Sequence, residues 1–155
     1  MASKADFTED EWELLREAPP GVGMVVIVSD RGGMMRESFS MAKAYAEARK
    51  QPGASQLLDE LVEAKPDMDH TRYGSKEELV EASLQRAEEA LALVGQKGTP
   101  EDVEQLRAFL WSVAEHVANA RKEGFMGLTG ERVSDAEEAA LERIKGTLGI
   151  SQPPT

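Results

Sequence analysis

The sequence predicts an all-α fold, a single compact domain of six or seven helices. Sequences typical of helix starts occur at Thr8, Ser75, Thr99 and Ser134, where a hydroxyl can accept a hydrogen bond from a nearby backbone N–H. Apolar residues recur at steps of three and four, which is the period of an amphipathic helix. Outside residues 22–28, no segment has the composition of a strand.

The first helix is expected over residues 9–18, directly after the Thr8 cap. Phe7 precedes the cap and Trp12 stands at the fourth helical position, the arrangement of a hydrophobic staple. Pro19 and Pro20 follow at once. Because proline disfavours helical backbone in the residue before it, we expect the helix to end there.

Residues 22–28 can be interpreted in two ways. Their β-branched side chains favour a strand. Their uniform apolarity and helical surroundings favour a short, fully buried helix, and a lone strand would have no partner to pair with. We expect the helix, and the strand stays the alternative.

Two further helices are expected in the first half of the chain. One spans residues 34–50, after the glycine pair 32–33. The other begins after Ser55, which can cap it, and ends before Pro66.

The two longest amphipathic patterns lie over residues 76–94 and 100–123, joined by a short glycine-containing link. Long helices with so short a connection favour a central antiparallel hairpin. The expected buried stripes are Val80, Leu84, Ala87, Leu91 and Val94 in the first helix, and Val103, Leu106, Leu110, Val113, Val117 and Ala120 in the second.

The last helix is expected from Asp135, with Ala140, Leu141, Ile144 and Leu148 facing inward. The glycine-rich segment 124–130 before it carries Phe125 and Leu128. We expect these apolar residues to dock on the core of the same chain, with a partner site as the alternative, because exposed apolar patches are uncommon on monomers. Residues 1–150 then form one domain, and 151–155 a disordered tail.

Composition excludes several classes of function. The chain has 29 Asp and Glu against 18 Lys and Arg, a net charge of −11, and no basic stripe. Such a surface repels nucleic-acid phosphates and anionic membranes. The lack of cysteine excludes disulfides and thiolate sites. No apolar signal core is present and no apolar run is long enough to span a bilayer, so we expect a cytoplasmic protein.

The turn before the 34–50 helix is one candidate ligand site. Its glycine pair precedes a helix N-terminus, where an anion can bind, and an arginine stands on either side. An acidic residue brackets the turn at each end. A plain helix-breaking turn with exposed arginines is the other interpretation. The candidate ligand-binding residues are Asp30, Arg31, Arg36 and Glu37.

The loop that follows Pro66 is the candidate metal site. Asp67, Asp69 and His70 offer oxygen and nitrogen donors suited to a hard or borderline cation. A solvated acidic loop is the alternative. The other histidine, His116, lacks the Glu-x-x-His spacing of di-iron bundles, so we expect a satisfied or half-exposed helical side chain.

Two stretches carry a resemblance to known proteins. F-T-x-x-E-W-x-x-L-x-x-A-P at residues 7–19 and G-F-x-G-x-x-G-x-x-V-S-x-x-E at 124–137 resemble small bacterial all-helical proteins of this length, a likeness that implies no activity. The spacing of Asp30 and Glu37 is similar to the acidic turns of the tellurite-resistance TerB-like family, although Arg31 stands where that family has glycine. This second resemblance implies metal-ion binding.

Three classes of function follow from these observations. The favoured one is a non-enzymatic interaction or stress-related accessory protein, since the helical patterning is good and no catalytic constellation is evident. The alternative is a small-ligand or metal-ion-binding helical module. An enzyme comes last. We expect no cofactor; an unidentified protein partner and a homo-oligomer both stay open.

Overall fold

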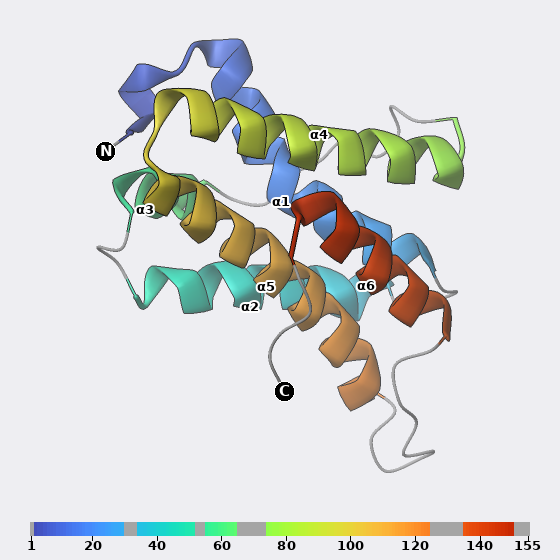
Figure 1. Cartoon of the computed structure of the whole chain (residues 1–155). Helices are drawn as coiled ribbons and strands as arrows, with labels where there is room; N and C mark the ends of the chain where they lie inside the picture. The colour runs from blue at the N-terminus through green and yellow to red at the C-terminus, as the bar shows by residue number, and fades with distance from the viewer. Residues whose placement is uncertain (1, 30–33, 52–54, 65–73, 125–134, 151–155) are drawn as a thin grey trace.

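Six α-helices and one 3-10 turn make up the regular structure in the described part of the computed structural model, and no strand occurs there (Figure 1). That part comprises residues 2–29, 34–51, 55–64, 74–124 and 135–150, with the side chains of 34–40, 120–124 and 135–136 left out. The all-α prediction is confirmed. The elements are η1 (Lys4–Asp6), α1 (Glu9–Ser29), α2 (Met34–Arg49), α3 (Gln56–Glu63), α4 (Lys76–Lys97), α5 (Pro100–Gly124) and α6 (Asp135–Leu148).

Helix α1 corrects one prediction and confirms another. Pro19 and Pro20 lie inside it and do not end it. A proline in a helix removes one backbone donor and strains the preceding turn, and the ribbon of α1 changes direction about halfway along its length (Figure 1). Both prolines are buried, and so is most of the apolar run after them. Burial of this second half offsets the cost of the prolines, and residues 22–28 are helical as expected.

Helix α1 is the element on which the others pack. It contacts α2, α4, α5 and α6, most extensively α4. At this contact Gly21 faces Ser83 on α4, and a Cβ atom on Gly21 would lie 3.4 Å from both Cβ and Oγ of Ser83, an ordinary contact distance. An ion pair between Glu17 and Arg86 also joins the two helices.

The expected central hairpin of α4 and α5 is not confirmed. The two helices touch, but α4 packs mainly on α1, and α5 mainly on α2 and α1. In Figure 1 they start close together at their connection and then diverge. Helix α6 contacts α1, α4 and α5, and Arg107 Nε on α5 donates to the carbonyl oxygen of Leu148 at 2.7 Å.

The predicted apolar stripes largely form the core. All members of the two long stripes that the structure describes are buried, except the half-buried Val80 and Val103. In α6, Ala140, Ile144 and Leu148 are buried and Leu141 is half-buried. Ala120, the glycine-rich segment 125–130 and the tail 151–155 lie outside the described side chains, so the expectations for them stay predictions.

Of the predicted caps, those at Thr8, Ser55, Ser75 and Thr99 are present. Thr8 and Glu11 satisfy each other's backbone N–H groups at 3.2 and 2.8 Å. Ser75 Oγ accepts from the Glu78 N–H at 3.1 Å, although the Glu78 carboxylate accepts from Gly74 instead of closing the box. The Thr99 cap is formed with Asp102, and Ser134 lies outside the described residues.

Asp102 ties the start of the chain to two helices. Its Oδ2 accepts from the backbone N–H groups of Ala2 at 3.1 Å and Thr99 at 3.0 Å. Its Oδ1 accepts from the hydroxyl of Ser55, the N-cap of α3, at 2.8 Å. Only 2% of Asp102 is exposed, so these bonds take the place of the water that it loses.

Candidate ligand pocket

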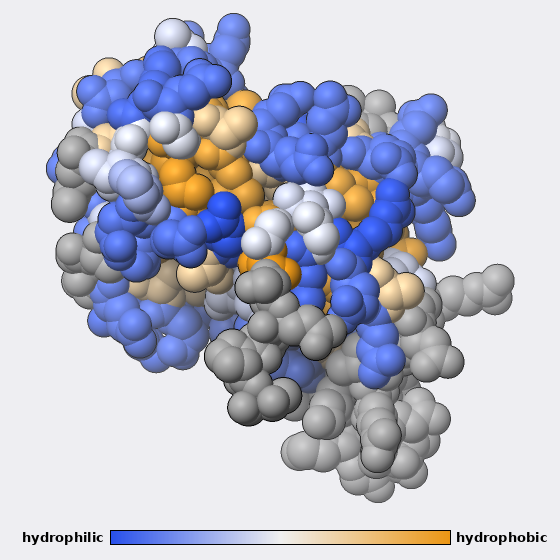
Figure 2. Space-filling view, in the orientation of Figure 1, coloured by the Kyte–Doolittle hydropathy of each residue, from blue (hydrophilic) through white to orange (hydrophobic). Residues whose placement is uncertain are grey.

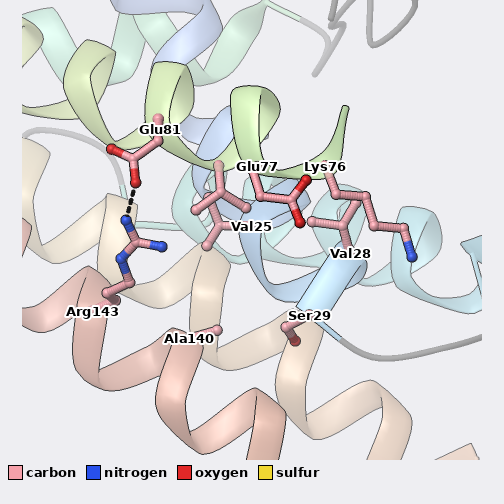
Figure 3. A pocket seen from close by; sticks show the side chains of 9 residues that line it. Val25, Val28, Ser29, Lys76, Glu77, Glu81, Ala140 and Arg143 are labelled. Carbon is pink, nitrogen blue, oxygen red and sulfur yellow. Dashed lines mark hydrogen bonds and ion pairs between the residues drawn. The ribbon is translucent and has the colours of Figure 1, made fainter. Parts of the chain in front are cut away.

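A pocket of about 300 Å³ lies where the end of α1, the start of α4 and the middle of α6 meet (Figure 3). This size is at the lower end of the range typical of small-molecule sites. The lining residues are Val25, Val28 and Ser29 from α1, Lys76, Glu77, Val80 and Glu81 from α4, and Ala140 and Arg143 from α6.

The walls of the pocket are apolar. Val25 is buried, Val28 and Val80 are half-buried, and Ala140 contributes a small buried surface from the opposite helix. Ala140 leaves room here because its side chain ends at Cβ. An apolar group that enters this space leaves water without losing hydrogen bonds.

Charged residues surround these walls. Arg143 on α6 pairs with Glu81 on α4 across one end of the pocket (Figure 3). With exposed side-chain fractions of 52% and 70%, this pair contributes little to stability. Figure 3 shows the Glu77 carboxylate over the space between Val25 and Val28, whereas the Lys76 side chain extends away from it.

Ser29, the last residue of α1, is the uncharged polar side chain among the described residues that line the pocket. Its hydroxyl donates to the carbonyl oxygen of Val26 at 2.6 Å, so the proton is committed to the backbone and the oxygen lone pairs stay available as acceptors. Among the described residues, the Ser29 hydroxyl donates to a backbone carbonyl and not to a side-chain base, which is not the arrangement of an activated nucleophile.

A second pocket, of about 430 Å³, lies beside the start of α1. It is lined by Lys4, Phe7, Thr8, Glu9, Asp10, Trp12 and Glu13. Its aromatic rings already have cationic partners from the chain: Lys4 Nζ lies 5.4 Å from the Trp12 ring centre, and Lys97 Nζ lies 5.5 Å from that of Phe7. We therefore regard the α1–α4–α6 pocket as the better candidate.

Comparison of this chain with protein-family models, curated protein sequences and solved structures finds no match. The site is therefore interpreted from its own residues alone.

The site residues predicted from the sequence are not tested. Asp30 and Arg31 lie outside the described residues, as do Asp67, Asp69 and His70. Arg36 and Glu37 belong to the first turn of α2, but the positions of their side chains are not described. Both candidate sites therefore stay predictions.

The histidine that the structure describes is a half-buried side chain on a helix with a hydrogen-bond partner on that helix, as expected. His116 is half-buried, and its Nδ1 lies 2.8 Å from the carbonyl oxygen of Ser112. Within the described ranges, no group of three or more His, Asp or Glu residues could hold a metal ion. In the same part of the chain, no helix is both long and apolar enough to cross a membrane.

Sequence reasoning did not identify this pocket. Glu77 was given no role from the sequence, and Val80 was placed in a buried stripe. The one available signal was that Val80 is the first residue of its stripe. A residue at the end of a stripe is often only half-buried, as Val80 is here. Nothing local indicated that α6 would leave a hollow opposite it.

Proposed function

We propose that this chain is a non-enzymatic helical module that binds a small ligand in the pocket between α1, α4 and α6. The observation that carries the proposal is the pocket itself, whose apolar walls and charged rim meet at the junction of three helices. Pockets of this kind between helices are common places for ligands.

The polar groups of the pocket support binding more than catalysis. The Ser29 hydroxyl donates to a backbone carbonyl, and Arg143 is paired with Glu81. Neither arrangement resembles a nucleophile with its base, or an acid and a base facing each other across a substrate. The class of protein that fits these contacts is a binder.

A neutral apolar compound tests this proposal. We expect 2-phenylethanol to bind saturably, and at ten times its Kd to stabilise the protein by about 1.4 kcal/mol. For a domain of this size that is a rise in Tm of about 3–6 °C. Isothermal titration calorimetry gives the Kd, and a thermal melt gives the shift.

Two variants locate the binding site. Val80→Phe fills the pocket from its half-buried edge and should abolish the response. Val103→Phe makes the same change at a half-buried position on α5 that does not line the pocket, and should leave the response intact. Equal responses from both variants, or no binding by the unmodified protein, would contradict the proposal.

The second candidate function is an interaction or stress-related accessory protein, the class that the sequence favoured. Apolar side chains gather on the surface where α4 and α5 lie near each other (Figure 2). Leu93 on α4 and Val103 on α5 are apolar and half-buried, so part of each side chain is open to a partner. A pull-down that returns one stoichiometric protein, or light scattering that detects a dimer, would favour this candidate; a monomer that captures nothing would count against it.

The sequence also left open a metal-ion-binding module, with candidate ligands in the turn before α2 and in the loop after Pro66. Metal analysis of the purified protein tests it, since stoichiometric Mg²⁺, Ca²⁺ or Zn²⁺ is expected only if Asp30 and Glu37, or Asp67, Asp69 and His70, act as ligands.

A further inference from the structure

We propose that the ligand of the α1–α4–α6 pocket is a small primary amine with an apolar body, whose ammonium group pairs with Glu77. This inference rests on the proposed function and specifies the chemistry of the ligand. It follows from which charges around the pocket are already paired and which are not.

Four of the described residues that line the pocket are charged, and two of these neutralise each other. Arg143 and Glu81 form an ion pair across one end. Lys76 extends away from the space, whereas the Glu77 carboxylate lies over it (Figure 3). Among the described residues, the Glu77 carboxylate has no hydrogen-bond or ion-pair partner. The charge left to face a ligand is therefore negative.

The other polar features favour a cation as well. Ser29 Oγ donates to the Val26 carbonyl and keeps its lone pairs, so it can accept a hydrogen bond from an ammonium group. Ser29 is also the last residue of α1, at the negative end of that helix dipole. The positive end of α4 opposes this effect, but Glu78 in its first turn partly compensates it.

The charge of the whole chain acts in the same direction. A net charge of −11 concentrates cations around the protein and disfavours anions. A carboxylate ligand would meet this field and the unpaired Glu77. A cationic ligand is attracted by both.

The apolar walls distinguish an organic amine from a metal ion. Divalent cations need several oxygen or nitrogen ligands, and among the described lining residues Glu77 and Ser29 supply too few. Val25, Val28, Val80 and Ala140 offer no such donors, but they can cover a hydrocarbon or aryl group. The pocket thus has one end for an ammonium group and walls for an apolar body.

Three compounds of similar shape test the inference: 2-phenylethylamine, 2-phenylethanol and 3-phenylpropionate. Calorimetry at low ionic strength should show that the unmodified protein binds the amine about two- to fivefold more tightly than the alcohol, as expected of an exposed ion pair. The carboxylate should bind more weakly than the alcohol. Because an exposed ion pair is screened by salt, the advantage of the amine should shrink at high ionic strength.

Glu77→Gln should remove the preference for the amine and leave the affinity for the alcohol unchanged. The matched control is Glu88→Gln. Glu88 is exposed on the same helix, three turns further on and on the same face, about 16 Å away along the axis. It changes the net charge equally but does not line the pocket, so it should keep the preference.

The outcomes separate the two proposals. If the alcohol binds as tightly as the amine, or the carboxylate binds more tightly, the amine inference is wrong and the ligand pocket stands. If Glu77→Gln keeps the preference, or Glu88→Gln also loses it, Glu77 does not recognise the ligand and the inference is likewise overturned. If none of the three compounds binds, the proposed function fails as well.

Discussion

Removal of the Asp102 carboxylate should cost a large part of the stability of this fold. Asp102→Ala leaves the backbone N–H groups of Ala2 and Thr99, and the hydroxyl of Ser55, without their acceptor. The site is almost fully buried, so water can replace the carboxylate only in part. The segment before α1 and the start of α3 should both loosen from α5.

The magnitude follows from the hydrogen bonds that are lost. Loss of a helix cap costs about 1 kcal/mol, and each buried donor left without a partner costs about 1–3 kcal/mol. Such terms are not additive, and the chain can relax, so we expect Asp102→Ala to lower the free energy of unfolding by about 2–4 kcal/mol. Asp102→Asn should cost less, since its amide oxygen can still accept from Ala2 and Thr99 and its amide nitrogen can donate to Ser55.

The effect of Asp102 should also depend on pH. Burial raises the pKa of Asp102. Hydrogen bonds from the Thr99 and Ala2 backbones and from Ser55 lower the pKa by more than burial raises it, so it lies below its ordinary value of 3.8. A carboxyl whose pKa is lower in the folded state stabilises the protein above about pH 4, and this contribution is lost as the pH falls through the folded pKa. The difference between the unmodified protein and Asp102→Asn should therefore shrink in acid.

Urea denaturation of the unmodified protein and both variants measures these effects, at pH 7 and at several values below pH 4. The expected order of stability at neutral pH is unmodified protein, Asp102→Asn, Asp102→Ala. A loss of less than about 0.5 kcal/mol for Asp102→Ala, typical of surface substitutions, would refute the reasoning. So would a difference between unmodified protein and Asp102→Asn that grows in acid.

Three further predictions concern the same fold. Leu110→Ala, at a fully buried position, should lower the free energy of unfolding by about 2–5 kcal/mol in urea denaturation. Gly98→Ala should cost about 1–3 kcal/mol, because its Cβ would lie 2.7 Å from Oδ2 of Asp102 and 3.0 Å from a carbonyl oxygen of α4; the double variant with Asp102→Ala should be less than additive. Lys97→Met should raise the pKa of Glu11 in an NMR titration, since the hydrogen bond from Lys97 at 2.6 Å is the main cause of its lowered pKa; an unchanged Glu11 pKa would contradict this.

Local signals predicted most of the helices. Caps at Thr8, Ser75 and Thr99 mark helix starts, because a hydroxyl and a backbone N–H three residues apart interact whatever the rest of the chain does. The apolar spacing identified the buried faces of the long helices, because residues three and four positions apart lie on the same face of any helix. Prediction failed at Pro19 and Pro20, where burial against other helices outweighs a local preference to end the helix.

Arrangement between helices was not predictable in this way. The loop between α4 and α5 suggested a central pair, but the buried apolar second half of α1 makes α1 the helix that contacts α2, α4, α5 and α6. The pocket depends on three segments far apart in sequence, around Val25, Glu77 and Ala140. Each of these residues has an ordinary helical explanation on its own, and only the packing of α6 brings them together.

A titration of isotope-labelled protein with 2-phenylethylamine, followed by NMR, tests the central claim most directly. We predict saturable chemical-shift changes centred on Val25, Ser29, Glu77, Val80 and Ala140, with the Kd found by calorimetry. Changes centred instead on the second pocket beside the start of α1, or spread over the acidic surface without saturation, would contradict the assignment of the ligand site to the pocket between α1, α4 and α6.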